Sequence, residues 1–592
     1  MSVLRRILGQ YGEGATQLET YGRQGNLIGK VRGEAFERAV ERYRQAFRGW
    51  SVRSYCGHKV VGLLFRPEET IEFLVATFAA VAEGFTVVPF YPNWSSETQH
   101  LHLKQYGIRA MAVGDGYARR VEGWCGQLEH VIRISGSLDD YPEPVTAEPY
   151  PDVPGDHPCA WIFTSGTSGK IPKCTVISVR NIEAAVENIR QIDFLAEGMT
   201  LHSPLSTSHI FAFAVVLGMM AVRPSRLLFS DVQYLARLPE EKIGKVDGVI
   251  LVPLVLNRMR SGFYGRLLET GPSADPRLAR LPLVFRRFLK VCAQTAERSV
   301  IDIESGRLAG LLRWPSLAIT RAFFRRRIPP RLGSPKFVVV GGAKPNLQSM
   351  AFLDVMGIRC LQGWGMTETT GALAVCSLED RFSGAYGTCG GVFADTRAYV
   401  EDGELIVEGP QVAEGYIHPD GQFDAFNGVK RTGDCAEFDL QGRLKVLGKA
   451  SDRITLENGM NYNPQTIEEK ILALDLKSRH LLEDVVVIGE GQARFACVFF
   501  LLELSMAGAE RRDPRSVVLP SHTEEYLLDL LRRVNSERAI DEQIGPWVVA
   551  PKPLRETAFL GPSGKIRRRL LEEEFRFAFD RTEIRRLERV TE

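Results

Sequence analysis

Short apolar runs alternate with longer amphipathic stretches through most of the chain. The runs KVVGLLF (59–65) and FTVVPFY (85–91) flank a segment whose apolar residues recur at helical spacing. This order predicts a strand, a helix and a second strand. Further apolar runs at AWIFT (160–164), DGVILVP (247–253) and KFVVVGG (336–342) repeat the alternation. The pattern therefore predicts an α/β fold whose mainly parallel sheets are covered by helices.

The pattern changes after about residue 387, where short strands and turns predominate. RAYVEDGELIVEG places a DG turn between two strand-like runs, and FDLQGRLKVLG has the same form, so both predict β-hairpins. Beyond Gly448 the alternation of strand and helix returns. We therefore expect a large N-terminal domain over 1–448, with a small β-barrel-like subdomain at about 387–448. A hinge over 449–453 and a small, mobile α+β C-terminal domain over 454–592 would follow.

The composition indicates a multidomain globular protein. A chain of 592 residues is too long for one core, and 44% hydrophobic with 25% charged residues is typical of folded domains. A net charge of only +2 argues against nucleic acid as a partner. The ten cysteines lack CxxC or Cys/His spacing, which predicts reduced thiols. The N-terminus lacks a signal-like apolar core and the longest apolar run, 210–222, is too short for a bilayer, so we expect a cytoplasmic protein.

The stretch TSGTSGKIPK (164–173) is the first candidate for chemistry. It lies between a strand-like run and a segment that we interpret as a helix. Backbone amides of a Gly/Ser/Thr loop form a nest of donors, and a helix N-terminus adds its dipole, so the loop predicts polyphosphate binding. A flexible surface loop is the alternative. The sequence fits neither GxxxxGK[ST] nor GxGxxG, so the loop is of another kind.

The loop and six further motifs resemble the adenylate-forming enzymes, the superfamily of acyl-CoA synthetases, peptide-synthetase adenylation domains and beetle luciferase. One departure is that Lys170 and Ile171 stand where this superfamily usually has a single residue before the Pro-Lys pair. The further motifs, in the superfamily's order, are VVGGAKP (339–345), QGWGMTET (362–369), RTGD (431–434), GKASDRI (448–454), NGMNYNPQTIE (458–468) and GPSGKIRRR (561–569).

The resemblance implies that ATP and a carboxylic acid form an acyl-adenylate, with loss of pyrophosphate. The residues that would bind ATP or AMP are Thr164, Ser165, Gly166, Thr167, Ser168, Gly169, Lys173, Gly342, Ala343, Trp364, Gly365, Asp434 and Lys449. The 164–173 loop would wrap the β- and γ-phosphates. Trp364 would stack on the adenine, and Asp434 would accept from both ribose hydroxyls. Lys449 stands where the superfamily usually has an arginine, which removes a rigid fork of donors.

The resemblance also assigns catalytic roles. Lys565, in GPSGKIRRR, would bridge the attacking carboxylate and the α-phosphate. Glu368 would hold Mg²⁺ and the Thr367 hydroxyl would reach the α-phosphate. His209 would lie beside the acyl pocket, although a histidine among apolar residues is often a core residue. Ser451 falls at the hinge position between the two domains.

The substrate is less closely specified. An insert at about 261–335, containing VFRRFLK and AFFRRRIPPRL, resembles the helical segment of long-chain fatty acyl-CoA synthetases. Its basic, amphipathic pattern suits a peripheral contact with a membrane surface, an acidic carrier protein, or a solvated helical pair, and these remain open. The resemblance implies a medium- to long-chain fatty or otherwise hydrophobic acid.

The thiol that accepts the acyl group is also open. CoA is the acceptor in acyl-CoA synthetases, whereas fatty acyl-AMP ligases use the phosphopantetheine of an acyl carrier protein. We favour CoA because the NGMNYNPQTIE stretch is present. A carrier-dependent module without CoA activity and a non-catalytic nucleotide-binding scaffold are further hypotheses. The presence of Lys565, Glu368 and Asp434 counts against the scaffold.

Overall fold

The structure is a computed structural model, and its chain divides into two compact units. One comprises Met1–Tyr399, Ile406–Lys430 and Phe438–Leu444, and the other comprises Val400–Leu405, Arg431–Glu437 and Lys445–Glu592. Within the described residues, no helix has both the length and the apolar character needed to cross a membrane. The structure describes residues 7, 16–124, 126–134, 150–164, 173–268, 281–304, 314–325, 329–380, 385–457, 460–478, 481–502, 510–513, 516–538, 543–559 and 566–579.

An eight-stranded sheet of the larger unit has the order β19-β18-β8-β7-β4-β3-β5-β6. Its strands are β3 (Lys59–Leu64), β4 (Phe85–Pro89), β5 (Ala110–Val113), β6 (His130–Arg133), β7 (Pro158–Phe163), β8 (Cys174–Ser178), β18 (Gly415–Ile417) and β19 (Phe423–Ala425). β3 and β4 are parallel and flank helix α3 (Thr70–Ala82), which confirms the predicted strand-helix-strand unit. β7 and β8 are antiparallel, and β18 adds antiparallel to β8.

A nine-stranded sheet has the order β15-β14-β13-β12-β11-β9-β10-β1-β2. Its strands are β1 (Gln17–Tyr21), β2 (Leu27–Arg32), β9 (Thr200–Ser203), β10 (Arg226–Ser230), β11 (Gly248–Leu251), β12 (Phe337–Val340), β13 (Arg359–Met366), β14 (Gly371–Val375) and β15 (Gly391–Val392). Strands β9 to β13 are parallel. Ligands of open α/β sheets bind at the carboxyl ends of such strands.

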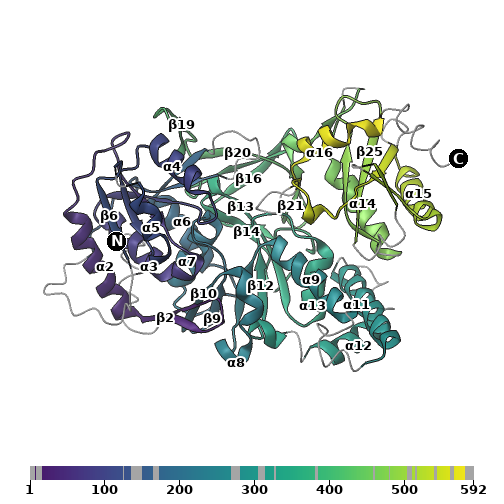
Figure 1. Cartoon of the computed structure of the whole chain (residues 1–592), viewed down its shortest axis with the longest axis horizontal. Helices are drawn as coiled ribbons and strands as arrows, with labels where there is room; N and C mark the ends of the chain where they lie inside the picture. Colours follow the sequence, from purple (N-terminus) through teal and green to yellow (C-terminus); the bar gives the residue numbers. More distant parts are fainter. Residues whose placement is uncertain are drawn as a thin grey trace. The chain divides into compact units, whose positions relative to one another are not determined.

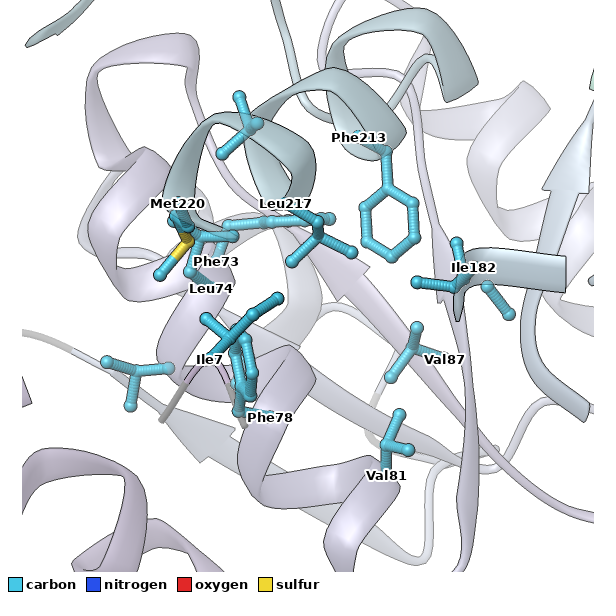
Figure 2. Packing of buried hydrophobic residues seen from close by; sticks show 14 of the residues in the cluster. Ile7, Phe73, Leu74, Phe78, Val81, Val87, Ile182, Phe213, Leu217 and Met220 are labelled. Carbon is cyan, nitrogen blue, oxygen red and sulfur yellow. The ribbon is translucent and has the colours of Figure 1, made fainter. Parts of the chain in front are cut away.

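The largest core surrounds two helices that are apolar on nearly every face, α3 and α7 (Ile210–Ala221). Figure 2 shows Phe73 and Phe78 of α3 near Leu217 of α7. The cluster also contains Val61 of β3 and Leu227 of β10, so it draws on both sheets. A helix that is hydrophobic all round is buried between layers, which fixes the position of the α7 N-terminus. Helices α2 (Gly33–Arg48) and α6 (Val179–Arg190) also contribute to this core, whereas α4 (Ser96–Gln105) and α5 (Ala118–Glu122) contribute to a separate cluster through Leu103 and Val121.

Another group of helices covers the other face of the nine-stranded sheet. Leu228 and Val249, whose strand neighbours Leu227 and Ile250 belong to the first core, face this second core. The helices are α8 (Glu240–Ile243), α9 (Pro253–Leu268), α11 (Leu283–Glu304), α12 (Trp314–Phe324) and α13 (Leu347–Val355). The predicted insert therefore supplies the end of α9 together with α11 and α12.

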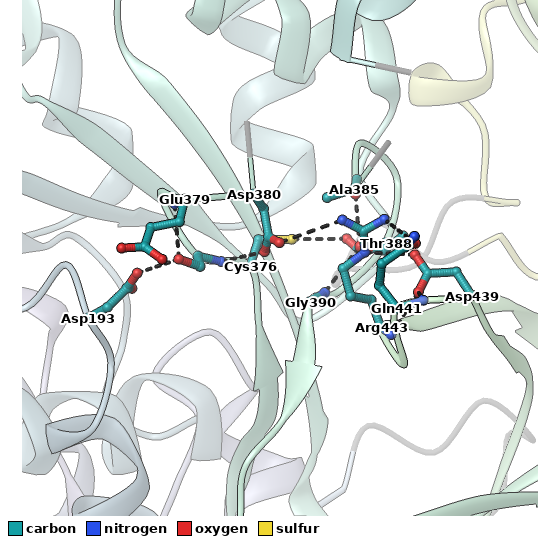
Figure 3. Close-up of polar contacts among 11 residues, drawn as sticks. Asp193, Cys376, Glu379, Asp380, Ala385, Thr388, Gly390, Asp439, Gln441 and Arg443 are labelled. Atoms are coloured by element: carbon teal, nitrogen blue, oxygen red, sulfur yellow. Dashed lines mark hydrogen bonds and ion pairs between the residues drawn. The ribbon is translucent and has the colours of Figure 1, made fainter. Parts of the chain in front are cut away.

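Strands β16 (Arg397–Glu401), β17 (Glu404–Glu408), β20 (Val429–Phe438) and β21 (Leu444–Lys449) form a sheet in the order β16-β17-β20-β21. Asp402 and Gly403 at the first turn have φ of +51° and +71°, which the DG signal predicts. Arg443, at the second turn, donates from its Nε to Asp439 at 2.7 Å and forms an ion pair with Asp380 at 3.6 Å (Figure 3). The β20–β21 turn is thereby tied to the segment that follows β14.

The smaller unit contains a three-stranded sheet, ordered β24-β25-β28, with helices against it. Arg568 forms a buried ion pair with Glu468 at 2.6 Å and donates to the carbonyl of Val487 at 2.7 Å. The elements are β22 (Ile454–Thr455), β23 (Asn461–Tyr462), α14 (Pro464–Lys477), β24 (Leu482–Ile488), β25 (Phe495–Leu501), β26 (Glu510–Asp513), β27 (Ser516–Val518), α15 (Ser521–Asn535), β28 (Ile544–Val549) and α16 (Arg568–Phe575). The predicted α/β class is confirmed, whereas the predicted domain limits stay a prediction.

Candidate functional site

The glycine-rich loop connects two antiparallel strands. Phe163 at the end of β7 pairs with Cys174 at the start of β8. The amide of Thr164 donates to the carbonyl of Lys173 at 2.9 Å, which closes the base of the loop. The residues between them lie outside the described part of the chain, and these include the predicted phosphate ligands Ser165, Gly166, Thr167, Ser168 and Gly169.

The prediction that a helix follows this loop is wrong. Cys174–Ser178 is a strand, buried along its whole length between β7 and β18, and α6 begins only at Val179. A short apolar run rich in β-branched residues, here CTVIS, pairs well within a sheet. The loop therefore has a strand at each end, and the α6 dipole does not act at Lys173, because that effect is confined to the first turn.

A tight reversal after β13 positions Glu368. Thr370 and Gly371 have φ of +49° and +99°, in the left-handed region. A Cβ atom on Gly365 would lie 2.0 Å from the carbonyl oxygen of Gly371, so only glycine fits there. The reversal leads the chain from β13 into the antiparallel strand β14. Glu368, within this turn, is only 7% exposed.

The segment before β18 is fastened beside this turn. Asn181, in the VRN that follows the loop, donates to the carbonyls of Pro410 and Val412 at 2.9 Å each. The amide of Ala413 donates to the carbonyl of Glu368 at 2.9 Å. Backbone bonds thus hold β18 next to Glu368.

Four side chains of the larger unit meet here, and we call them the Glu368 cluster: Lys173, Glu368, Tyr416 and Lys430. The Tyr416 hydroxyl donates to the Glu368 carboxylate. The ammonium groups of Lys173 and Lys430 lie 4.5 Å and 4.8 Å from the centroid of the Tyr416 ring. Burial and the neighbouring Glu368 carboxylate raise the pKa of Tyr416 above its usual range, so its hydroxyl stays protonated and can donate.

The charges in this cluster suit a polyphosphate. Two lysines and one carboxylate leave an excess of positive charge, and a phosphate chain carries the complementary charge. Among the described residues, no group of three or more His, Cys, Asp or Glu side chains forms a metal site. Mg²⁺ in nucleotide sites is held by one or two carboxylates plus phosphate oxygens, so a single buried carboxylate fits that ion.

Sequence reasoning missed Tyr416 and Lys430. Lys430 directly precedes RTGD, but Tyr416 lies in a stretch with no motif that we used. It reaches Glu368 because β18 pairs with β8 and places Tyr416 opposite Thr175. Such long-range pairing leaves no local signal.

The predicted adenine-binding residues lie on neighbouring strands. Val340 ends β12 opposite Gln362 of β13, so Gly342 and Ala343 leave the sheet at the level of Trp364. Gly342 has a φ of +84°, and the nearest atom to a Cβ on it would be 3.8 Å away, so its surroundings are open. Trp364 is 9% exposed.

His209 caps the N-terminus of α7. Its Nδ1 accepts from the amide of Phe211 at 3.2 Å, so in the neutral ring Nε2 carries the proton. The ring centroid lies 6.4 Å from that of Tyr91, and the Tyr91 hydroxyl donates to the carbonyl of Phe163 at 3.2 Å. These contacts bring the α7 terminus near the base of the loop.

Thr367 begins the short turn Thr367–Thr369 that follows β13 in the larger unit. Four other predicted residues, Asp434, Lys449, Ser451 and Lys565, belong to the smaller unit. The ammonium group of Lys449 lies 2.7 Å from a carboxylate oxygen of Asp434, and Asp434 is 6% exposed. One oxygen of the proposed ribose acceptor therefore already has a cationic partner. Ser451 is exposed in the short turn Ala450–Asp452. Lys565 lies outside the described residues. The roles given to all these residues stay predictions.

Comparison with known families gives two matches. Residues 57–417 match the family described as AMP-binding enzyme, and residues 451–582 match the AMP-binding enzyme C-terminal domain. The chain is 24% identical to the long-chain-fatty-acid–CoA ligase FadD15 of Mycobacterium tuberculosis over 531 residues, which cover 85% of each protein. It is 24% identical to the long-chain-fatty-acid–[acyl-carrier-protein] ligase AEE15 of Arabidopsis thaliana, over 72% of this chain and 62% of that protein.

Solved structures share the fold. The anthranilate CoA ligase AuaEII, in complex with anthranoyl-AMP, is similar with a TM-score of 0.67 and 16% identity, over 97% of each chain. The fatty acyl CoA synthetase of Mycobacterium tuberculosis is similar with a TM-score of 0.58 and 18% identity, over 97% of this chain and 98% of that one.

Proposed function

Because this chain belongs to the AMP-binding enzyme family of adenylate-forming ligases, we propose that it activates a hydrophobic carboxylic acid with ATP and transfers the acyl group to CoA. The Glu368 cluster is the observation that carries the proposal. It combines a buried carboxylate with two lysines, directly beyond the base of the glycine-rich loop. This combination suits the triphosphate of ATP and its magnesium ion.

In the proposed first step, a carboxylate oxygen of the substrate attacks the α-phosphorus of ATP. The bond from that phosphorus to the bridging oxygen breaks, and pyrophosphate leaves. Lys173 and the loop would hold the β- and γ-phosphates, and Thr367 would donate to the α-phosphate. Lys565 would lie between the two reactants and stabilise the charge that develops in the transition state. Glu368 would hold Mg²⁺, which neutralises phosphate charge when bound.

In the proposed second step, the thiolate of CoA attacks the acyl carbon of the adenylate and AMP leaves. Asp434 would still bind the ribose. Ser451 would lie at the hinge whose movement takes the enzyme from the first step to the second. His209 lies at the N-terminus of the apolar helix α7, near the loop base. That position supports a role beside the acyl group.

The proposed substrate is a medium- to long-chain fatty acid. The names of relatives such as FadD15 support it, as does the wholly apolar helix α7. The alternative acceptor is the phosphopantetheine of an acyl carrier protein, which the name of AEE15 favours.

Pyrophosphate release tests the proposal and separates the acceptors. The purified chain is assayed with Mg-ATP and a series of fatty and aryl acids, each alone, with CoA, and with a phosphopantetheinylated carrier protein. We expect release that requires the acid and is accelerated by CoA. Acceleration by the carrier protein alone would favour the alternative, and no acid-dependent release would contradict the function.

A further inference from the structure

Large apolar side chains are exposed along the first three turns of α11. Val284, Phe288 and Val291 expose 79%, 48% and 59% of their surfaces, and Phe285 exposes 40%. Positions 284, 288 and 291 follow the i, i+4, i+7 spacing that places residues on one helix face. The opposite face, with Leu289 and neighbouring residues, is buried in the second core. The helix is thus apolar toward both the core and the solvent.

Helix α12 continues this exposed surface. Figure 1 shows α11 and α12 side by side. The ring of Phe285 meets that of Phe323 on α12 edge-to-face at 6.3 Å, and Ile319, one turn before Phe323, is 41% exposed. We call Val284, Phe285, Arg287, Phe288, Val291 and Ile319 the α11–α12 surface. A contiguous apolar patch of this kind marks an interaction site rather than a solvated helical pair.

The charge on this surface has one sign. Arg287 is exposed and lies within the apolar stripe, three residues after Val284 and four before Val291. Lys290, partly buried, adjoins it on the next turn. The acidic residues of α11, Glu297, Asp302 and Glu304, are at most 5% exposed, and α12 contains no Asp or Glu. A partner that meets this surface is therefore apolar in part and anionic.

We propose that the α11–α12 surface binds the headgroup boundary of an anionic lipid bilayer. Valine and phenylalanine side chains at helical spacing can enter the acyl boundary while arginine pairs with lipid phosphate. An acidic carrier protein would be met mainly through basic side chains. Here four of the five exposed side chains over residues 284–291 of this surface are apolar, which favours lipid.

This inference rests on the proposed function for its purpose, because long-chain acids partition into bilayers. An enzyme held at the bilayer surface draws its acid from the phase where the acid is most concentrated. The binding itself requires neither ATP nor acid, so it can be measured independently of catalysis.

The test is co-sedimentation of the full chain with vesicles of phosphatidylcholine, alone or mixed in equal parts with phosphatidylglycerol. One variant carries Val284→Asp and Phe288→Asp together. The matched control is Leu101→Asp on α4, because Leu101 is also a helix residue and is 48% exposed. Arg287→Gln tests the charge separately. Pyrophosphate release with a short, water-soluble acid and no vesicles is measured for every variant.

We expect the unmodified chain and Leu101→Asp to bind the anionic vesicles, and the double variant to bind about tenfold more weakly or worse. Arg287→Gln should lessen the preference for anionic over neutral vesicles. Equal binding by the double variant, or no binding by the unmodified chain while its activity is intact, would overturn the inference. If the double variant lost rate only when a carrier protein was the acyl acceptor, the inference would be overturned in favour of a carrier-protein partner. Vesicle binding without acid-dependent pyrophosphate release would instead contradict the proposed function.

Discussion

Removing the Tyr416 hydroxyl tests the centre of the Glu368 cluster. Tyr416→Phe deletes the donor to the Glu368 carboxylate, together with the oxygen that accepts from Lys430 Nζ at 3.4 Å, and keeps the ring beside Lys173 and Lys430. A hydrogen bond to a charged group is worth about 1.5–3 kcal/mol. Since about 1.4 kcal/mol is a factor of ten, we expect kcat/KM for Mg-ATP to fall roughly 10- to 150-fold.

The assay is the initial rate of pyrophosphate release at saturating acid, with Mg²⁺ and ATP varied separately. If Tyr416 acts by orienting Glu368 toward the metal, the variant should also need more Mg²⁺ for half-maximal rate. Adding Tyr416→Phe to Glu368→Ala should then cost little more, because the two changes remove the same interaction.

Tyr399→Phe is the matched control. Tyr399 also donates to a glutamate, Glu408, at 2.9 Å, but it belongs to the β-rich sheet and we assign it no role in the reaction. Its loss should leave the rate and the Mg²⁺ requirement unchanged. An unaltered rate in Tyr416→Phe, or an equal loss in both variants, would refute the reasoning about the cluster.

Three further predictions concern the smaller unit. Lys565→Ala should lower the rate of adenylate formation by orders of magnitude while ATP binding, measured by calorimetry, stays near normal, because its bridge forms mainly in the transition state; unchanged pyrophosphate release would exclude that role. Asp434→Ala should raise KM for ATP with little change in kcat, and a fall in kcat alone would contradict the ribose assignment. Burial, with the charge of Glu468, raises the pKa of Asp484 to about 7. The folded chain then keeps a proton that the unfolded chain loses at about pH 4, so stability falls as pH rises from about 4 to about 7. Asp484→Asn should lessen the drop in Tm between pH 5 and pH 8, and an identical drop would disprove this coupling.

Local patterns made much of the fold predictable. The strand-helix-strand unit of β3, α3 and β4 follows from period and spacing within one short stretch. The turn at Asp402 and Gly403 follows from its residue types. Strand β8 was misassigned because an apolar run of five residues beside a helix does not reveal its own period. Only its pairing with β7 and β18 makes it a strand.

The site was predictable where motifs are contiguous and hidden where it depends on long-range pairing. Glu368 stands in QGWGMTET and could be selected from the sequence. Tyr416 could not, because its contact with Glu368 arises from the addition of β18 to β8. The ion pair of Lys449 with Asp434 likewise depends on the pairing of β20 with β21. Side-chain partners across strands follow from register, which a single sequence does not specify.

Reversible formation of an acyl-adenylate is the central claim, and exchange of labelled pyrophosphate into ATP tests it most directly. The exchange is measured with the purified chain, Mg²⁺ and a fatty acid, in the absence of any thiol, so that the second step cannot contribute. The account predicts exchange that requires both the acid and Mg²⁺ and that is lost in Lys565→Ala. Absence of exchange with every acid, or release of inorganic phosphate from ATP without acid, would contradict it.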